Sequence, residues 1–372
     1  MRVLILYASA GNGHRRAAQA VYEAFINAGH NDISMLDILD FTPKWFKAFY
    51  SRGYMNIVTH AKWLWRFAYH MSDKGKGQFF PKSWRSFLNK MMARKLVHFL
   101  EEYKPDVIVS THFMANDVIS RFKKEGCTCS LVSIVTDYTA HSFWVSDGVD
   151  HYFVAIDAVR DELISMGVDG NKITVSGIPV PQSFLKTGPR EDLLGHFGLK
   201  DDFVALIIGG TVRTEMLIDT VKVLSRDMQM IVGCGKDTGL YDEIKPLEEV
   251  ARGLKVYKII DDMTKAMSGA DAIVTKPGGL VVTEALTKRV PMILVDPIPG
   301  QEDGNRKIMA KLGAAFTGDN SIEVIKYLTL LKSSQEERER MKSAMQGLAQ
   351  GDVAGRMFSH IIEMYGKLSQ NV

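Results

Sequence analysis

Short runs of apolar residues alternate with longer amphipathic stretches along the whole chain. In the first half these runs predict strands at Val3–Tyr7, Ile33–Asp37, Val107–Ser110, Leu131–Val135 and Tyr152–Val154. In the second half they predict strands at Phe203–Ile208, Met228–Val232, Lys255–Tyr257, Ala272–Thr275 and Met292–Val295. Helical stretches lie between them, the first over about His14–Ala28 and ended by Gly29. This alternation is typical of α/β folds with parallel sheets built from βαβ units.

A cluster of glycine and proline residues divides the chain near its middle. Gly177–Pro181 contains two prolines, and Gly188 and Pro189 follow soon after. Because proline lacks an N–H donor and interrupts helices and central strands, this stretch predicts a linker. With 372 residues, the chain has a length that suits two domains. We expect an N-terminal domain over 1–180 with an insertion at 41–102, and a C-terminal domain over 181–352.

The two expected domains are of similar size and pattern. Two Rossmann-like sheets joined at this linker are expected to form a cleft at the carboxyl ends of their strands, where such folds bind ligands. The last helix, within 353–372, is expected to pack back on the first domain. Strands of this length leave no apolar run near the ~20 residues that span a bilayer. The first strand begins at the second or third residue, so we expect no signal peptide.

The net charge of +3 conceals one strongly basic segment. Between Pro43 and His98 there are twelve Lys and Arg residues and one acid, Asp73, which gives +11 and leaves −8 for the remainder. A near-neutral protein with one basic patch is expected to bind a localised anionic partner. The three cysteines provide no even disulfide framework and no zinc spacing, so we interpret them as reduced structural thiols.

The basic segment is also aromatic, with thirteen Phe, Trp and Tyr residues between positions 45 and 87. Four of the five tryptophans lie in it: Trp45, Trp63, Trp65 and Trp84. Tryptophans interleaved with cations favour contact with an anionic membrane surface. Two alternatives stay open: the aromatic residues form the core of a helical subdomain, or they stack on single-stranded nucleic acid. The membrane interpretation is the one we favour.

The stretch Lys276-Pro-Gly-Gly-Leu280 carries the clearest chemistry. It follows a predicted strand, and a helix begins near Leu280. Gly278 and Gly279 would let backbone N–H groups approach an anion at the helix N-terminus. Glu284 lies one turn farther along, where it could accept hydrogen bonds from a ribose diol. The alternative is a plain glycine turn with a solvent-facing glutamate.

A second polar loop follows the next strand and strengthens this interpretation. Gln301, Glu302 and Asn305 offer the mixture of donors and acceptors that sugar hydroxyls require. The first strand of the same domain ends in another glycine turn with Gly210 and Thr211, and Arg213 of that turn could contact a diphosphate. The pattern therefore predicts a nucleotide-sugar site.

Candidate catalytic residues follow strands of the first domain. Gly11-Asn-Gly13 precedes His14 at the end of the first strand, and the neutral imidazole of His14 could take a proton from an acceptor hydroxyl. The alternative is a tight turn with His14 in the first turn of a helix. Asp137 follows another strand and could act as the base or orient His14, and His112 is a third candidate.

Together these motifs resemble a known family. Lys276-Pro-Gly-Gly with Glu284, and Pro299-Gly-Gln-Glu302 with Asn305, resemble monogalactosyldiacylglycerol synthases and the bacterial processive diacylglycerol glucosyltransferases. More distantly they are similar to the transferase that adds N-acetylglucosamine to lipid I. The further matching segments, in the family's order, are Gly11–His14, Val135–Asp137, Trp144, Val149–Asp150, Gly177–Pro179 and Gly233–Asp237.

The resemblance implies a GT-B fold and an inverting transfer of glucose or galactose from UDP-glucose or UDP-galactose to diacylglycerol. It implies that Gly278 and Gly279 face the diphosphate, that Glu284 faces the ribose, and that Gln301, Glu302 and Asn305 lie near the hexose. The expected donor set also includes Gly13, Gly210, Thr211, Arg213, Lys276 and Leu280. The sequence has no Asp-x-Asp motif, so we expect a site without metal or cofactor, in which backbone amides stabilise the departing UDP.

The expected location is cytoplasmic, on the inner face of the cell membrane, with no nucleic-acid partner. Three other functions stay open: transfer to a polyprenyl-linked acceptor, a sugar-nucleotide 2-epimerase of the same fold, and a UDP-sugar sensor without turnover. Glucose and galactose differ by one epimeric hydroxyl, and the residues do not separate them.

Overall fold

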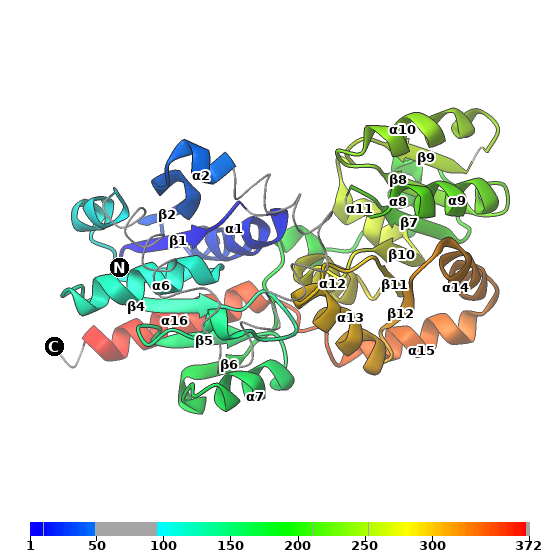
Figure 1. Ribbon diagram of the computed structural model, residues 1–372. Coiled ribbons are helices and arrows are strands. Elements are labelled where there is room, and N and C mark those ends of the chain that lie inside the picture. Colours follow the sequence, from blue (N-terminus) through cyan, green and yellow to red (C-terminus); the bar gives the residue numbers. More distant parts are fainter. Residues whose placement is uncertain (10, 49–94, 211, 252, 370–372) are drawn as a thin grey trace. The chain divides into compact units, whose positions relative to one another are not determined.

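The computed structural model describes residues 1–9, 11–48, 95–210, 212–251 and 253–369. These residues form two compact units. The first comprises Met1–Gln182, Ile298–Gln301 and Asp352–Val372, and the second comprises Ser183–Pro297 and Glu302–Gly351. Each unit contains one six-stranded parallel sheet with helices on both faces (Figure 1).

The sheet of the first unit has the strand order β2-β1-β3-β4-β5-β6. Its strands are β1 (Val3–Tyr7), β2 (Ile33–Asp37), β3 (Val107–Ser110), β4 (Ser130–Ile134), β5 (His151–Val154) and β6 (Ile173–Val175). Its helices are α1 (Asn12–Asn27), α2 (Lys44–Ala48), α6 (Phe113–Lys124), α7 (Asp157–Ser165) and α16 (Val353–Ser369), and residues 95–103 are also helical. Strands β1 and β3 are buried on both faces, which explains why they read as continuous apolar runs.

The two faces of this sheet have separate cores. On one face α1 and α16 pack together, with the rings of Phe25 and Phe358 edge to face at 4.9 Å. The C-terminal helix therefore lies on the first unit although the second unit precedes it in the chain (Figure 1). On the other face the core contains side chains of α6, α7 and the helical residues 95–103, together with the buried Phe46 of α2.

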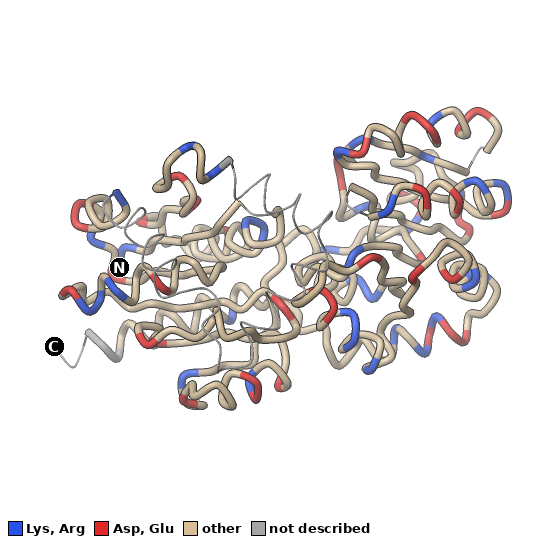
Figure 2. The backbone as a smooth tube through the Cα atoms, viewed as in Figure 1, with Lys and Arg blue, Asp and Glu red and all other residues tan. Residues whose placement is uncertain are grey.

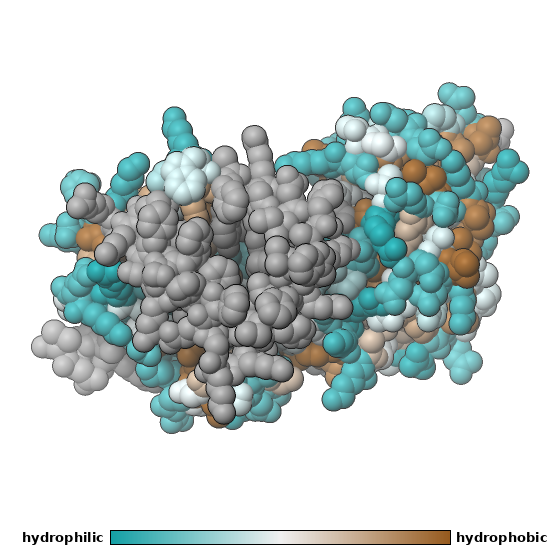
Figure 3. All heavy atoms as spheres, viewed as in Figure 1, coloured by the Kyte–Doolittle hydropathy of each residue, from teal (hydrophilic) through white to brown (hydrophobic). Residues whose placement is uncertain are grey.

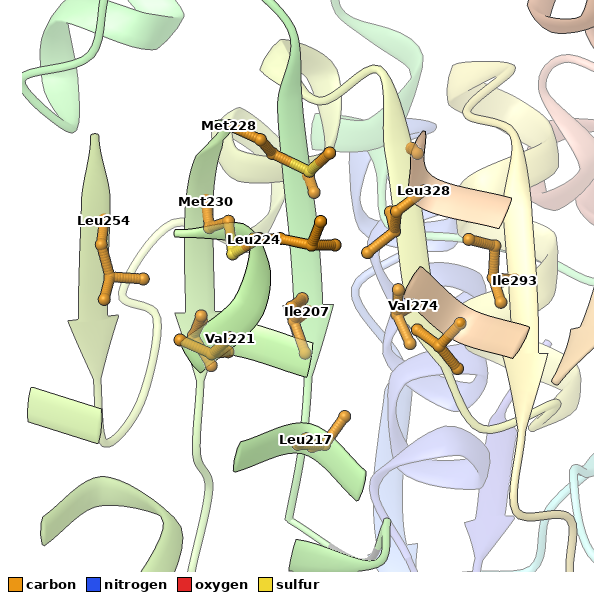
Figure 4. Close-up of a cluster of buried hydrophobic side chains, with 14 of the residues drawn as sticks. Ile207, Leu217, Val221, Leu224, Met228, Met230, Leu254, Val274, Ile293 and Leu328 are labelled. Atoms are coloured by element: carbon orange, nitrogen blue, oxygen red, sulfur yellow. The ribbon is translucent and has the colours of Figure 1, made fainter. Parts of the chain in front are cut away.

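The sheet of the second unit has the order β12-β11-β10-β7-β8-β9. Its strands are β7 (Val204–Ile208), β8 (Gln229–Gly233), β9 (Leu254–Tyr257), β10 (Ala272–Thr275), β11 (Met292–Val295) and β12 (Ala315–Gly318). Its helices are α8 (Arg190–His196), α9 (Thr214–Leu224), α10 (Thr238–Ile244), α11 (Met263–Gly269), α12 (Gly279–Lys288), α13 (Gln301–Lys311), α14 (Ser321–Ser333) and α15 (Gln335–Gln346). Figure 4 shows one core of this unit, in which Leu217 and Val221 of α9 and Leu328 of α14 lie over Ile207 and Val274 of the sheet.

The surface of the second unit is mixed. Basic and acidic residues are interspersed along its helices (Figure 2). On the face drawn in Figure 3 its exposed hydrophobic residues are scattered among hydrophilic ones. Within the described parts of the chain, no helix combines the length and the apolar character needed to cross a membrane.

The strand order places one topological switch point in each sheet. In the first unit the chain runs from β1 outwards to β2 and then returns to β3 on the other side of β1, and in the second unit β7 and β10 are related in the same way. At such a point the loops after the two neighbouring strands diverge, and ligands of doubly wound sheets bind in the resulting crevice. The residues after β1, β3, β7 and β10 are therefore the first to consider for function.

The sequence pattern missed two strands, β6 and β12. Each lies at an edge of its sheet, and each is short and only partly buried. An edge strand has one neighbour and needs no continuous apolar run, so its signal in the sequence is weak. The first helix begins at Asn12, two residues before the expected start, and ends at Asn27, one residue before the expected end.

Candidate active site

The switch point of the first unit positions His14 in the first turn of α1, directly after the glycine turn that follows β1. Gly11, the residue before this helix, has φ of +156°, a conformation that side chains disfavour. Gly13 lies between the turn and His14 within α1. The neighbouring loop, after β3, contains Thr111 and His112. The register of β1 with β3 brings these two loops to the same edge.

Hydrogen bonds fix both the orientation and the tautomer of His14. Its Nδ1 lies 2.7 Å from the carbonyl oxygen of Thr111 and 3.0 Å from the hydroxyl of Thr136. The Thr111 hydroxyl in turn donates to the carbonyl oxygen of His14 at 3.0 Å. A carbonyl oxygen can only accept, so Nδ1 must carry the hydrogen, and in the neutral ring the lone pair lies on Nε2.

Burial keeps this imidazole neutral. It lowers the pKa of His14 to about 4, and the hydrogen bond to Thr111 opposes that shift only in part. At neutral pH the ring is therefore uncharged and can accept a proton or a hydrogen bond at Nε2. These are the properties required of a general base that acts on a hydroxyl group.

His112 supports His14 from the side. Its ring is buried and meets the His14 ring edge to face, with centroids 4.6 Å apart. Its Nδ1 accepts a hydrogen bond from the backbone N–H of Met114 at 3.2 Å and so caps α6. Burial, followed by the proximity of His14, lowers the pKa of His112 well below its ordinary value. In this arrangement His112 has a clear structural task, which is to hold α6 and the ring of His14.

Asp137 lies on the third loop at this edge. It follows β4, and its side chain is buried. Thr136, the residue directly before it, is the one whose hydroxyl contacts His14. The loop that carries Asp137 therefore belongs to the same cluster as His14, which agrees with the expected grouping of these two residues at one sheet edge.

The glycine pair after β10 begins α12 in the second unit. Gly278 is the N-cap and Gly279 is the first helical residue, and glycine has no side chain of its own with which to cap the helix. The N–H groups of a first turn have no partner within their helix, and the helix dipole favours an anion beside them. A β-carbon on Gly278 would lie 4.0 Å from Oε1 of Glu302, so the Glu302 carboxylate is a close neighbour of this turn.

Asn305 contacts the backbone that precedes the glycine pair. It is fully buried in α13, and its Nδ2 donates a hydrogen bond to the carbonyl oxygen of Pro277 at 2.9 Å. The sequence predicted that Asn305 lies near the hexose. In the structure at least one of its amide hydrogens serves the backbone that leads into the glycine pair.

The remaining residues expected on this segment are almost completely buried. Glu284 is 1% exposed, and Lys276 and Leu280 are also buried. Burial of a carboxylate costs free energy unless hydrogen-bond donors or cations surround it. This rules out a solvent-facing Glu284, the alternative left open by the sequence. Gln301 and Glu302, in the first turn of α13, are half-buried.

Arg213 has an internal partner. Its backbone N–H donates to Oδ2 of Asp296 at 3.1 Å, and its Nε lies 3.6 Å from Oδ1 of the same residue. Arg213 thus ties the loop after β7 to the end of β11. Its Nη2 also donates a hydrogen bond to the carbonyl oxygen of Asp319, and half of the side chain is exposed.

Two glycine turns pack against each other beside Arg213. Gly210 follows β7 with φ of +85°, and Gly235 follows β8 with φ of +64°. A β-carbon on Gly235 would lie 3.0 Å from the Cα of Gly210. The close approach of the two backbones therefore disfavours a side chain at Gly235, and the positive φ of both positions favours glycine at each. Thr211, which was expected to contact the donor, lies outside the described residues.

Only the start of the basic aromatic segment is described. Trp45 in α2 is 59% exposed, whereas the adjacent Phe46 belongs to the core. Lys47 forms ion pairs with Asp37 and Asp40. Trp63, Trp65 and Trp84 lie outside the described residues.

Sequence reasoning overlooked the partners that set the properties of the predicted residues. The carbonyl oxygen of Thr111 fixes the tautomer of His14, the hydroxyl of Thr136 contacts the same nitrogen, and Asp296 orients Arg213. Each of the three follows a predicted strand, at the carboxyl edge of the sheet of its own unit. The position of a polar residue directly after a strand was therefore the available signal.

Two family models match consecutive parts of the chain. Residues 14–180 match monogalactosyldiacylglycerol (MGDG) synthase, and residues 204–357 match the glycosyltransferase family 28 C-terminal domain. The chain is also 28% identical over 353 residues to the processive diacylglycerol beta-glucosyltransferase of Bacillus subtilis (strain 168), and the match covers 93% of this chain and 91% of that protein.

Solved structures with the same fold include MurG and a UDP-GlcNAc 2-epimerase. MurG of Acinetobacter baumannii has a TM-score of 0.64 at 16% identity, over 99% of this chain and 100% of that one. The UDP-GlcNAc 2-epimerase of Neisseria meningitidis has a TM-score of 0.64 at 13% identity, over 98% of this chain and 100% of that one. At these identities the likeness concerns the fold alone, which is GT-B. The two family-model matches and the Bacillus subtilis relative agree with one another, and over most of its length this GT-B chain is similar to the monogalactosyldiacylglycerol synthases and the processive diacylglycerol glucosyltransferases.

Proposed function

We propose that the protein is an inverting glycosyltransferase that moves a hexose, glucose or galactose, from a UDP-sugar to the hydroxyl of 1,2-diacylglycerol, or to the resulting glycolipid. The observation that carries the proposal is the match to a diacylglycerol glucosyltransferase over more than nine-tenths of both chains. The resulting product is a membrane glycolipid.

The donor site in this proposal rests on the start of α12. The backbone N–H groups at Gly278 and Gly279, at the start of α12, suit a diphosphate, and the buried Glu284 suits the ribose hydroxyls. Glu302, beside Gly278, is suited to the hexose. We further propose that UDP departs without help from a metal ion, because the sequence has no Asp-x-Asp motif and the helix terminus supplies positive potential.

The proposed catalytic mechanism rests on His14. The acceptor hydroxyl oxygen attacks the anomeric carbon while the bond from that carbon to the UDP oxygen breaks, and the hydroxyl proton passes to Nε2 of His14. One displacement inverts the anomeric configuration. Asp137 is the second candidate for the base, and the loop it shares with Thr136 also allows it to assist His14.

The proposed binding to the membrane rests on the charge of one segment. Segment 43–98 carries +11 among thirteen aromatic residues, and Trp45 at its start is exposed. We propose that this segment places the enzyme on the anionic inner face of the cell membrane, where diacylglycerol lies.

The 2-epimerase is the alternative with a specific observation in its favour, since such an enzyme shares the fold over almost the whole chain. It would need neither a lipid acceptor nor a basic aromatic segment. Incubation with UDP-N-acetylglucosamine alone tests it, because an epimerase yields the 2-epimer in the absence of any acceptor.

The main experiment supplies the full chain with vesicles of anionic phospholipid and diacylglycerol, and with labelled UDP-glucose or UDP-galactose in parallel, with and without EDTA. We expect label in the lipid phase from one donor, in β linkage, and no effect of EDTA. His14→Gln is expected to lower the rate at least ~100-fold, the usual contribution of a general base. His98→Gln, at an exposed histidine, is the matched control. Absence of labelled lipid with both donors refutes the proposal.

A further inference from the structure

Two cysteines on the loop between α6 and β4 lie in contact. The Sγ atoms of Cys127 and Cys129 are 2.9 Å apart. Residues 127–129 are neither helical nor turn-like and lead directly into β4. In an extended segment residues i and i+2 point to the same side, so the two sulfurs meet while Thr128 is exposed.

The two thiols have unequal surroundings. Cys129 is 3% exposed and belongs to the core of the first unit, whereas Cys127 is only half-buried. The backbone N–H of Cys129 lies 3.4 Å from Sγ of Cys127, within reach of a weak hydrogen bond to sulfur. One thiol is therefore accessible to a reagent, and its neighbour is protected.

Hydrogen bonding makes the accessible thiol the acidic one. The two thiols share a hydrogen bond, and once Cys127 is ionised only the Cys129 thiol can donate in it. This bond, assisted by the Cys129 amide and by Lys123, lowers the pKa of Cys127 to about 6 despite partial burial. The same bond raises the pKa of Cys129. Lys123 is held beside the loop by Asp150 and by the carbonyl oxygen of Gly148.

The third cysteine provides an internal contrast. Cys234 is fully buried in the second unit, and burial raises its pKa to about 11. A reagent that requires a thiolate should react with Cys127 and leave Cys234 intact.

We propose that Cys127 and Cys129 form a redox-active dithiol that a low-molecular-weight disulfide converts into an intrachain disulfide. The Cys127 thiolate attacks one sulfur of the external disulfide, which breaks and releases one thiol molecule as its thiolate. Cys129 then loses its proton, attacks Sγ of Cys127 and displaces the second thiol molecule. The protein gives up two electrons and two protons, and the external disulfide becomes two thiols.

The geometry requires little rearrangement for this step. A disulfide bond is about 2.05 Å long, so the sulfurs need to approach by roughly 0.9 Å from their separation of 2.9 Å. The site lies at the start of β4, and the Thr136 contact to His14 lies after its end. The dithiol is thus separate from the candidate active site and independent of the proposed sugar transfer.

The test exposes the folded, full-length protein to oxidised glutathione and measures its intact mass and the linkage in peptides. We expect the wild type to lose about 2 Da, with a Cys127–Cys129 link and no glutathione retained. Cys129→Ser cannot resolve and should retain one glutathione at Cys127. Cys127→Ser should retain none at the buried Cys129. A wild-type protein that keeps its mass, or keeps glutathione, overturns the proposal.

The alkylation rate of Cys127 against pH gives a readout that requires no variant. We expect a midpoint near the lowered pKa of about 6 in the wild type, and a higher midpoint in Cys129→Ala, which lacks the donating thiol. A wild-type midpoint at the ordinary cysteine value of about 8.5 would contradict the inferred hydrogen bond.

Discussion

Replacement of Gly235 by alanine tests whether the two glycine turns of the second unit are packed as described. Gly235 has φ of +64°, in the left-handed region, and a β-carbon there would lie 3.0 Å from the Cα of Gly210. Since Gly210 also has positive φ, neither backbone can easily yield. The substitution therefore combines a conformational penalty with a backbone clash.

The magnitude follows from these two contributions. A left-handed conformation costs a residue with a side chain about 1 kcal/mol. Insertion of one methyl group against a backbone that must move costs at least about 1 kcal/mol more. The second unit should therefore lose about 2 kcal/mol of its free energy of unfolding, which corresponds to a roughly 30-fold change in an equilibrium constant.

Native-state hydrogen exchange is the suitable assay. All five tryptophans precede residue 145, so their fluorescence does not report on this unit. The slowest amides of β7 and β8 exchange through opening of the unit. In Gly235→Ala they should exchange about 30-fold faster than in the wild type.

Gly239→Ala is the matched control. Gly239 lies in α10 four residues farther along, and its β-carbon would lie at an ordinary 3.5 Å from Oδ1 of Asp237. Alanine is favoured over glycine within a helix by about 0.5 kcal/mol or more, so this variant should exchange no faster than the wild type. Equal exchange in wild type and Gly235→Ala, or equal acceleration in both variants, would refute the reasoning.

Three other predictions concern the first unit. Gly148→Ala would place a β-carbon 2.4 Å from the Cα of Ser120, so the unit should lose about 3 kcal/mol of stability in urea denaturation monitored by tryptophan fluorescence. Thr136→Val removes the hydroxyl beside Nδ1 of His14 and should lower kcat about 5-fold without changing KM for the UDP-sugar, since one hydrogen bond contributes about 1 kcal/mol. Burial, followed by the proximity of His360, lowers the pKa of His151 to about 4. The unfolded chain therefore takes up a proton near its ordinary value of about 6.5 before the folded protein does. The stability of the wild type relative to His151→Phe should accordingly fall as the pH drops from about 6.5 to 4, and a pH-independent difference would contradict this linkage.

One matched variant accompanies Gly148→Ala, and a second kinetic constant serves as the control for Thr136→Val. Gly366→Ala, in α16, meets no atom within 4 Å and should not lower stability. For Thr136→Val, a parallel change in KM would indicate a general distortion of the loop, and unchanged kcat would show that the hydroxyl does not assist His14.

Of the ten strands that the sequence predicted, eight lie inside a sheet and two, β2 and β9, lie at an edge. The other two edge strands were missed, since β6 has one buried residue and β12 contains Thr317 and Gly318. The positions of the candidate site residues were also predictable, because parallel strands end at one edge and polar residues follow them there.

What these residues contact was much less predictable. The charge of Arg213 was visible in the sequence, but its pairing with Asp296 depends on contact between the loops after β7 and β11, two strands that β10 separates in the sheet. Likewise the amide of Asn305 was assigned to a sugar, and the structure shows that its Nδ2 binds the carbonyl oxygen of Pro277. A side chain that follows a strand can serve the ligand, the backbone or both, and only coordinates separate these tasks.

For His14, the residue type predicts a possible base, and the surrounding structure determines which nitrogen is basic. A histidine after β1 suggested a base, yet a histidine with an ordinary pKa would be partly protonated near neutral pH. Burial keeps this ring neutral, and the Thr111 carbonyl directs the hydrogen to Nδ1. The group that selects the basic nitrogen is thus a backbone oxygen, which any residue at position 111 would provide. Substitution of Thr111 should therefore preserve the tautomer, whereas displacement of the β3 loop should not.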